Sequence, residues 1–275
     1  KFRQHNATQF FESFSEASKS TYYLFVGKAT AYTSGTTGGS DSSPPTPSDS
    51  PTDTEFYAWD SMLAAKNVTS SDVSYAIPRR NWANGDTYDM YDDDISSSST
   101  TTSGASNLYD STFYFMTSDY RVYKVLDNNA GAAYSGAEPT SESTSPFELG
   151  GYVLKYMYAI TTSEAAKYLT SDFIPVSNDS TITAAATDGG IESLKITAGT
   201  GYTNGTYYAA IYGDGTSAGT SSGGIVRITV SGGVIQSFGL TAGSDTTLHA
   251  GGAAYTFGTV NLASGYTFSE WLLQH

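Results

Sequence analysis

Short runs rich in tyrosine and aliphatic residues recur along this chain, and long stretches of Gly, Ser, Thr and Pro separate them. Clear examples are Tyr22–Lys28, Tyr120–Asn129 and Gly151–Ile160. Tyrosine and threonine favour the pleated, half-buried surface of a sheet, whereas glycine supplies turns and bulges. With 22 tyrosines and 28 glycines in 275 residues, we expect a β-rich structural protein.

The composition narrows the range of partners. The chain has 27 acidic and 13 basic residues and a net charge of -14, which opposes binding to a phosphate backbone or to an anionic membrane surface. We therefore expect neither a nucleic-acid partner nor a membrane partner. Cysteine is absent, which fits assembly in a reducing cytoplasm. The chain begins without methionine and its last residues still resemble ordered structure, so we expect both ends to be trimmed.

The N-terminal part is expected to alternate helices and strands. Asn6 followed by Gln9 resembles the start of a helix, which we predict over Asn6–Ala17 with Asn6 as its N-cap. We predict a buried strand over Thr21–Ala31, a proline-rich loop over Ser34–Thr54 and a second helix over Glu55–Lys66.

The middle of the chain is expected to be mainly strand. A Ser-, Thr- and Gly-rich stretch, Ser96–Ser106, predicts a flexible loop without a site. The expected elements are a strand at Val73–Ile77, a hairpin of Phe113–Met116 with Tyr120–Leu126, a strand at Tyr152–Ile160, and a helix at Ser163–Leu169 capped by Thr162 or Ser163.

The last third carries an internal repeat. Ile191–Gly199 matches Ile235–Gly243 at an offset of 44 residues, and a hairpin signal lies between Ile225–Val230 and Val234–Phe238. We therefore predict a core domain at 1–178, a Gly-, Thr- and Tyr-rich all-β insertion or added module at 179–268, and a return to the core, or the start of a missing C-terminal part, at 269–275. The predicted fold class is mainly β with a few short helices (α+β), with a β-sandwich-like core.

Four blocks occur in an order that resembles one kind of virion protein. They are Tyr22–Lys28, Ile77–Trp82, Tyr120–Asn129 and Gly151–Ile160. Together they resemble the dimeric baseplate wedge subunit of T-even-type contractile-tail bacteriophages, and more closely the versions carried by cyanophages. The resemblance covers about Lys1–Val176, and the later module has no counterpart in it.

The resemblance implies a structural role without chemistry. It implies a virion protein of the tail baseplate, assembled in the host cytoplasm, which forms a homodimer and contacts other baseplate wedge proteins. It implies β-sandwich character, and a part in baseplate assembly and in triggering contraction. The alternative is a carbohydrate- or receptor-binding tail module, because exposed aromatic side chains in 181–267 would stack on sugars. A tail-associated glycosidase is a further hypothesis.

Arg79 and Arg80 are notable in so acidic a chain, and Trp82 follows them closely. We take these three residues as interface candidates. One reading is that the arginines pair with carboxylates across a subunit interface, using the bidentate geometry of guanidinium. The other is an intrachain ion pair that ties the loop to its own domain.

No pattern in the sequence indicates catalysis. His5, His249 and His275 do not lie at metal-ligand spacing from Cys, Asp or Glu, and Asp92–Asp94 lacks the alternating ligands of a calcium loop, which favours a solvated acidic turn. A phosphate-binding loop and a Gly-x-Ser-x-Gly nucleophile elbow are also absent. We therefore expect no enzyme activity and no catalytic, cofactor-binding or metal-binding residues.

Overall fold

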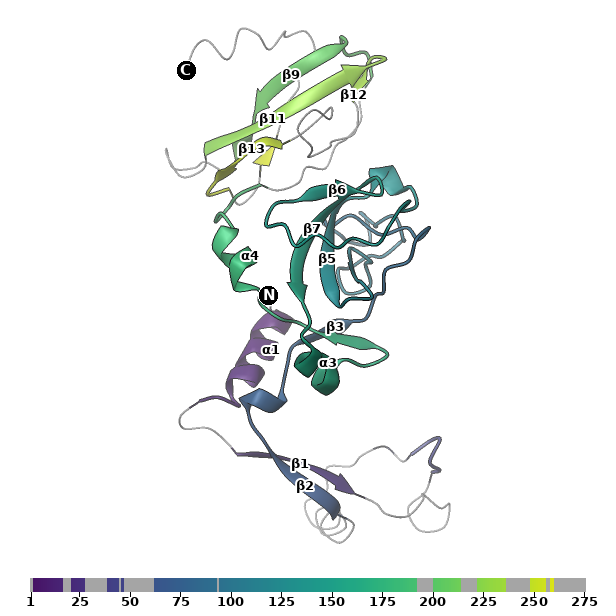
Figure 1. Cartoon of the computed structure of the whole chain (residues 1–275), viewed down its shortest axis with the longest axis vertical. Coiled ribbons are helices and arrows are strands. Elements are labelled where there is room, and N and C mark those ends of the chain that lie inside the picture. Colours follow the sequence, from purple (N-terminus) through teal and green to yellow (C-terminus); the bar gives the residue numbers. More distant parts are fainter. Residues whose placement is uncertain are drawn as a thin grey trace. The chain divides into compact units, whose positions relative to one another are not determined.

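The computed structural model describes residues 2–16, 21–27, 39–44, 46, 62–92, 94–191, 200–213, 222–235, 248–255 and 258–259 (Figure 1). Most of its regular structure is strand, arranged in several small sheets, and every pairing between described strands is antiparallel. The predicted mainly-β α+β class is therefore confirmed. The β-sandwich character of the core remains a prediction.

The chain divides into two compact units, Lys1–Tyr75 and Ala76–His275. The domain boundaries predicted at 178/179 and 268/269 remain predictions. Among the described residues, no helix is long and apolar enough to cross a membrane.

The first unit begins with helix α1 (Phe2–Glu12). Aromatic residues in the helix and just after it contact aromatic rings further along the chain. The ring of Phe14 lies 4.6 Å from that of Tyr22, and Phe11 stacks on Tyr75 at 4.6 Å. Asn6 lies inside α1, so its predicted role as N-cap is wrong. The capping pattern misled because Phe2 already starts the helix.

Strand β1 (Tyr22–Gly27) pairs with strand β2 (Met62–Val68), and the short helix η1 (Ser70–Asp72) follows. The strand predicted at Thr21–Ala31 is present at β1, but it is exposed and not buried, because in the described part of the chain it has only one neighbour. Met62–Lys66 is strand, so that part of the predicted helix is wrong; Glu55–Ser61 lies outside the described residues, as does most of Ser34–Thr54.

The main sheet of the second unit has four strands in the order β4-β5-β7-β6. The predicted hairpin and the strand after it are confirmed at β4, β5 and β7. The bounds are β4 Tyr114–Met116, β5 Arg121–Asp127, β6 Phe147–Leu149 and β7 Tyr152–Ala159.

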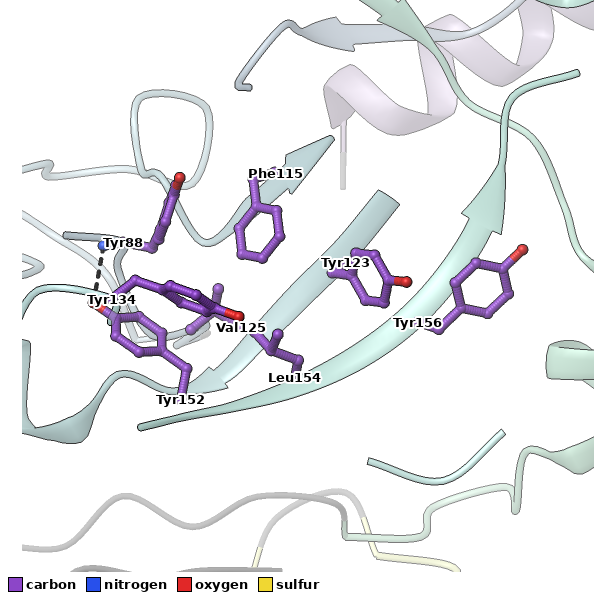
Figure 2. Close-up of a cluster of buried hydrophobic side chains, with 8 residues drawn as sticks. All are labelled: Tyr88, Phe115, Tyr123, Val125, Tyr134, Tyr152, Leu154 and Tyr156. Atoms are coloured by element: carbon purple, nitrogen blue, oxygen red, sulfur yellow. Dashed lines mark hydrogen bonds between the residues drawn. The ribbon is translucent and has the colours of Figure 1, made fainter. Parts of the chain in front are cut away.

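Tyrosine rings fill the core on one face of this sheet, as Figure 2 shows. The eight buried members are Tyr88, Phe115, Tyr123, Val125, Tyr134, Tyr152, Leu154 and Tyr156. Tyrosine hydroxyl groups in this core form hydrogen bonds to nearby backbone carbonyls. The Tyr152 hydroxyl donates to Ala132 O at 2.5 Å, and the Tyr134 hydroxyl donates to Ala137 O at 2.9 Å. Burial raises the pKa of Tyr88, Tyr134 and Tyr156 to about 12. A buried tyrosine therefore supplies apolar area while its polar tip reaches a backbone carbonyl.

A second cluster forms where strand β3 (Ala76–Pro78) pairs with strand β8 (Phe173–Pro175). Helix α3 (Thr162–Tyr168) packs against it, and Thr161 is the N-cap, in a reciprocal capping box with Glu164. The predicted cap was thus one residue late. The buried members of this cluster are Tyr114, Met116, Val122, Tyr158, Ile160 and Ile174.

Beyond helix α4 (Ser180–Ala185), the described residues form a sheet in which β11 pairs with β9, β12 and β13. The predicted turn at Gly232–Gly233 is confirmed, since both residues have the positive φ that a tight hairpin needs. The repeat is untested, because residues 192–199 and 236–243 lie outside the described part. The bounds are β9 Gly205–Ala210, β10 Tyr212–Gly213, β11 Ser222–Ser231, β12 Val234–Ile235, β13 Leu248–Ala253 and β14 Gly258–Thr259.

Candidate interaction surface around Arg79 and Arg80

The three predicted interface residues lie on one extended segment that continues from β3. The backbone N–H of Arg79 donates to Asp172 O at 2.7 Å. Met116 N donates to Arg80 O at 2.7 Å and Trp82 N donates to Met116 O at 2.8 Å, which makes a parallel bridge beside β4. Backbone hydrogen bonds therefore hold the segment on both sides, at Asp172 just before β8 and at Met116 in β4.

The Arg79 side chain holds the turn that precedes β8. Its Nη1 donates to Thr170 O at 2.9 Å, and its Nε donates to the side-chain oxygen of Asn81 at 3.0 Å. The turn closes on itself, with Thr170 N donating to Phe173 O at 3.0 Å. Phe173 follows directly and is 43% exposed. Arg79 thus stabilises a turn that presents an aromatic ring to solvent.

Arg80 holds a different turn, at residues 107–110. Its Nη2 donates to Tyr109 O at 3.0 Å and to Asp110 O at 2.9 Å, and its guanidinium carbon lies 5.8 Å from the centre of the Tyr114 ring. Burial raises the pKa of Tyr114, while the nearby Arg80 charge lowers it in part. Tyr109 itself is 60% exposed. Arg80 therefore also fixes the backbone beneath an exposed aromatic side chain.

Trp82 points into the unit and packs against the tyrosine core. Its ring meets Tyr134 edge-on, with centroids 5.8 Å apart and planes at 89°. Its indole N–H is buried without a hydrogen-bond partner among the described residues, as is Nε of Arg80. The half-buried Trp82 thus contributes to packing within its own chain.

The two arginines hold different turns, and their described contacts are all within the chain. They bind backbone carbonyls and Asn81, and no carboxylate among the described residues forms an ion pair with either. Within the described residues, the arginines therefore hold the two turns by hydrogen bonds to backbone carbonyls and not by an intrachain ion pair. A role of Arg79, Arg80 and Trp82 in a subunit interface stays a prediction.

A buried carboxylate that the sequence analysis missed organises the Ser- and Thr-rich loop. Asp89 is fully buried and accepts four hydrogen bonds, from Ser103 N at 2.8 Å, Ser103 Oγ at 2.7 Å, Ser111 Oγ at 3.0 Å and Thr112 N at 2.8 Å. Burial acts to raise the pKa of Asp89, but these hydrogen bonds outweigh it and hold the pKa below its ordinary value. The predicted loop at 96–106 is present, and it is anchored at Ser103 by this carboxylate.

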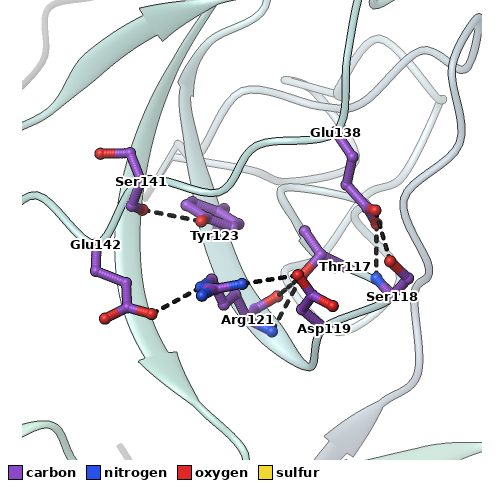
Figure 3. A network of polar contacts seen from close by, with 8 residues as sticks. All are labelled: Thr117, Ser118, Asp119, Arg121, Tyr123, Glu138, Ser141 and Glu142. Atoms are coloured by element: carbon purple, nitrogen blue, oxygen red, sulfur yellow. Dashed lines mark hydrogen bonds and ion pairs between the residues drawn. The ribbon is translucent and has the colours of Figure 1, made fainter.

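A polar network at the β4–β5 turn was also missed (Figure 3). Arg121 donates from Nε to Glu142 at 2.7 Å and from Nη1 to Asp119 at 3.0 Å. Glu138 accepts from both the N–H and the hydroxyl of Ser118 at 2.6 Å. The network ties residues 138–142 to the turn, and because its groups are largely exposed it does so in contact with water.

None of these arrangements indicates catalysis. Within the described residues, no group of three or more His, Cys, Asp or Glu is placed to hold a metal ion. At the acidic run, Asp94 N donates to the Asp92 carboxylate at 2.9 Å, as in a local turn, and Asp93 lies outside the described residues. The chemistry that the described surface offers is recognition through aromatic rings and charged groups.

Sequence signals for the missed residues were weak. Asp89 is one of 27 acidic residues, and nothing in its neighbours marks it as buried. The exposed rings of Tyr109 and Phe173 stand in the same kinds of sequence as buried ones. Only the Arg79–Arg80 pair carried a signal, because adjacent arginines are unusual in this chain.

Comparison with known families gives one match. Residues 1–136 match the family model described as Phage-Gp8: Bacteriophage T4, Gp8. The match covers just under half of the chain and includes β1 to β5, Arg79, Arg80, Trp82 and Asp89. A search of curated proteins found no match to this chain.

Proposed function

We propose that this chain is a T4-type baseplate wedge protein that acts as a homodimer and links neighbouring wedge proteins, because residues 1–136 match the Gp8 family model. Its place is the virion, in the tail baseplate, and its role is structural. The family match carries this conclusion, and it supports the structural role over the carbohydrate- or receptor-binding alternative.

The proposed mechanism is mechanical. The dimer holds its neighbours in one arrangement before tail contraction and in another after it, by a rigid-body change at its interfaces. A buried sheet with a tyrosine core suits this task, because close-packed interiors transmit strain and do not yield to it. We further propose that the chain has no enzymatic activity and that it is a cyanophage version of this subunit, for which the four sequence blocks are the support.

We propose that the surface beside the arginines contacts a neighbouring wedge protein. Arg80 fixes the turn that carries the exposed Leu108 and Tyr109, and Arg79 fixes the turn before the exposed Phe173. Aromatic side chains on rigid turns are favourable interface residues, because little conformational entropy is lost when they are buried. In this proposal the arginines act by positioning the turns.

The first experiment is sedimentation equilibrium of the purified chain. The proposal expects a dimer at micromolar concentration, and a monomer at that concentration would contradict it. Cryo-electron microscopy of the intact tail then asks where the chain sits. Two copies in each wedge at the baseplate periphery are expected, whereas density at a fibre tip would revive the receptor-binding alternative.

The surface is tested by reconstitution with the neighbouring wedge proteins of the same phage. The double variant Tyr109→Ser, Phe173→Ser should lose assembly and keep its melting temperature, because both rings are exposed. The matched variant Arg79→Ala, Arg80→Ala should lower both, since it frees the turns. Unchanged assembly in both variants, with only the melting temperature lowered in the second, would leave the arginines a purely intrachain role.

A further inference from the structure

The hairpin of β1 and β2 is apolar and exposed on both of its faces. Successive side chains of a strand point to opposite faces, so Leu24 and Val26 lie on one face of β1, and Tyr23 and Phe25 on the other. All four are exposed, with 66% for Tyr23 and 63% for Leu24. This is the opposite of an edge strand protected by charged residues.

Among the described residues, neither a third strand nor a covering layer joins this hairpin. Two strands alone are marginal in water, and three or more strands or a covering layer are required for independent stability. Contiguous exposed apolar surface on a protein marks an interaction site more often than a free surface. An exposed edge strand also offers unpaired backbone N–H and C=O groups to a further strand. The exposed apolar side chains and the free strand edge therefore favour a partner that supplies another strand with apolar side chains.

Charge indicates which partner fits. Two copies of a chain with a net charge of -14 repel one another over most of their surfaces. The sequence contains no Asp or Glu between Ala17 and Ser40, or between Ser61 and Ser71. In the two strands, the single charged side chain is Lys66, which forms an ion pair with Asp72. The hairpin is thus a neutral, apolar place where two acidic copies meet without repulsion.

We propose that β1 of one copy pairs antiparallel with β1 of a second copy about a two-fold axis, so that two hairpins form one four-stranded sheet. This inference rests on the proposed homodimer and names the surface that forms it. The apolar side chains of one β1 then lie opposite those of the other, and each contact occurs twice, as in an isologous interface. The middle of the strand, Leu24 and Phe25, lies closest to the axis.

Disulfide trapping tests this pairing directly, because the chain has no cysteine of its own. Residues opposite one another in an antiparallel pair have Cβ atoms about 4.5–5.5 Å apart, close to the spacing that a disulfide spans. Leu24→Cys and Phe25→Cys are each oxidised at low micromolar concentration. At least one should give a covalent dimer at least 10-fold faster than the control Thr181→Cys, which lies at an exposed position of α4. Equal, slow cross-linking of all three would overturn the inference.

Sedimentation equilibrium separates failure of this inference from failure of the homodimer. Leu24→Lys should raise the dimer dissociation constant at least 10-fold with an unchanged circular dichroism spectrum, while Thr181→Lys leaves it unchanged. A wild-type dimer that Leu24→Lys does not weaken refutes the hairpin surface and keeps the homodimer. A monomeric wild type refutes both.

Discussion

Strands β1 and β7 have similar sequences and opposite surroundings. Both combine tyrosine with leucine, valine and other apolar residues. In β7, Tyr152 and Leu154 are completely buried, whereas in β1 Tyr23 and Leu24 are more than half exposed. Strand β7 lies between β5 and β6 with the tyrosine core on one face, while β1 has β2 as its described neighbour. Residue type thus predicts that a segment is a strand, and the layers around it decide whether it is buried.

The difference in burial between β7 and β1 also distinguishes residues that stabilise the fold from residues that are available for assembly. Burial of an aromatic side chain in the core stabilises its own chain, because the contacts form as that chain folds. An exposed apolar side chain on β1 contributes little until a partner covers it. The same kind of substitution should therefore lower folding stability in the core of the main sheet and weaken assembly on β1.

The largest expected effect comes from Phe115→Ala in the core. Phe115 is fully buried among tyrosines, so the change should reduce the free energy of unfolding by about 3–5 kcal/mol. Phe25→Ala is the matched control on β1, and it should cost less than about 0.5 kcal/mol in the monomer. Urea unfolding of both variants at concentrations below the dimer dissociation constant measures this. Similar losses in both would mean that β1 is buried within its own chain.

Two carboxylates extend the comparison to polar groups. Asp89→Asn should destabilise the protein by about 2–3 kcal/mol at pH 7, because four donors lose a charged acceptor. Asp72→Asn, in η1 after the hairpin, should have a smaller effect on stability, although the hydrogen bond from Lys66 lowers the pKa of Asp72 to about 2.

The pH dependence distinguishes the cause of the Asp89 effect. The pKa of Asp89 is lower in the folded state than in the unfolded chain, so its stabilising contribution is present above the unfolded pKa, near 4, and is lost as the pH falls through the folded pKa. The difference between wild type and Asp89→Asn should therefore shrink below about pH 4. A difference between wild type and Asp89→Asn that stays constant with pH would contradict the ionic role.

Local signals in the sequence predicted much of the main sheet. The hairpin of β4 and β5 and the strand β7 follow from alternating apolar residues with a turn at Ser118–Asp119. The capping pattern near Thr161 gave α3 to within one residue. These elements are set by neighbours in the chain, which is why a pattern of a few residues was enough.

The predictions failed where contacts between residues far apart in the sequence determine the structure. Met62–Lys66 resembles a helix in isolation, since Met, Leu, Ala and Lys all favour helices, yet it pairs with β1 some 40 residues earlier, with Lys66 opposite Leu24. The acceptors of Arg79 and Arg80 are backbone carbonyls of Thr170, Tyr109 and Asp110. A carbonyl acceptor leaves no mark in a sequence, so a search for carboxylate partners could not find these contacts.

A smaller, stabilising effect is expected at a strained residue next to the buried sheet. Ala130 has φ 56° and lies between Asn129 and Gly131, which also have positive φ. An L-residue with a Cβ is strained there, so Ala130→Gly should raise the free energy of unfolding by about 0.5 kcal/mol. Ala132→Gly is the control, because Ala132 has φ -69° and needs no glycine; it should lower stability by a similar amount. Thermal unfolding of both variants measures the pair, and loss of stability in both would show that the turn is not strained.

The smallest effect is expected from the ion pair between Arg121 and Glu142, although it is well formed in Figure 3. The Glu142 side chain is largely exposed, so water competes for it, and Glu142→Gln should cost no more than about 0.5 kcal/mol. That cost should vanish in about 1 M salt, where charges are screened within a few ångströms. Glu138→Gln, which weakens two hydrogen bonds to Ser118, should cost more and depend less on salt, as chemical denaturation at low and high salt will measure. If Glu142→Gln instead costs as much as Asp89→Asn, exposed charges would stabilise this fold as strongly as its buried groups, and burial would no longer explain why β7 and β1 differ.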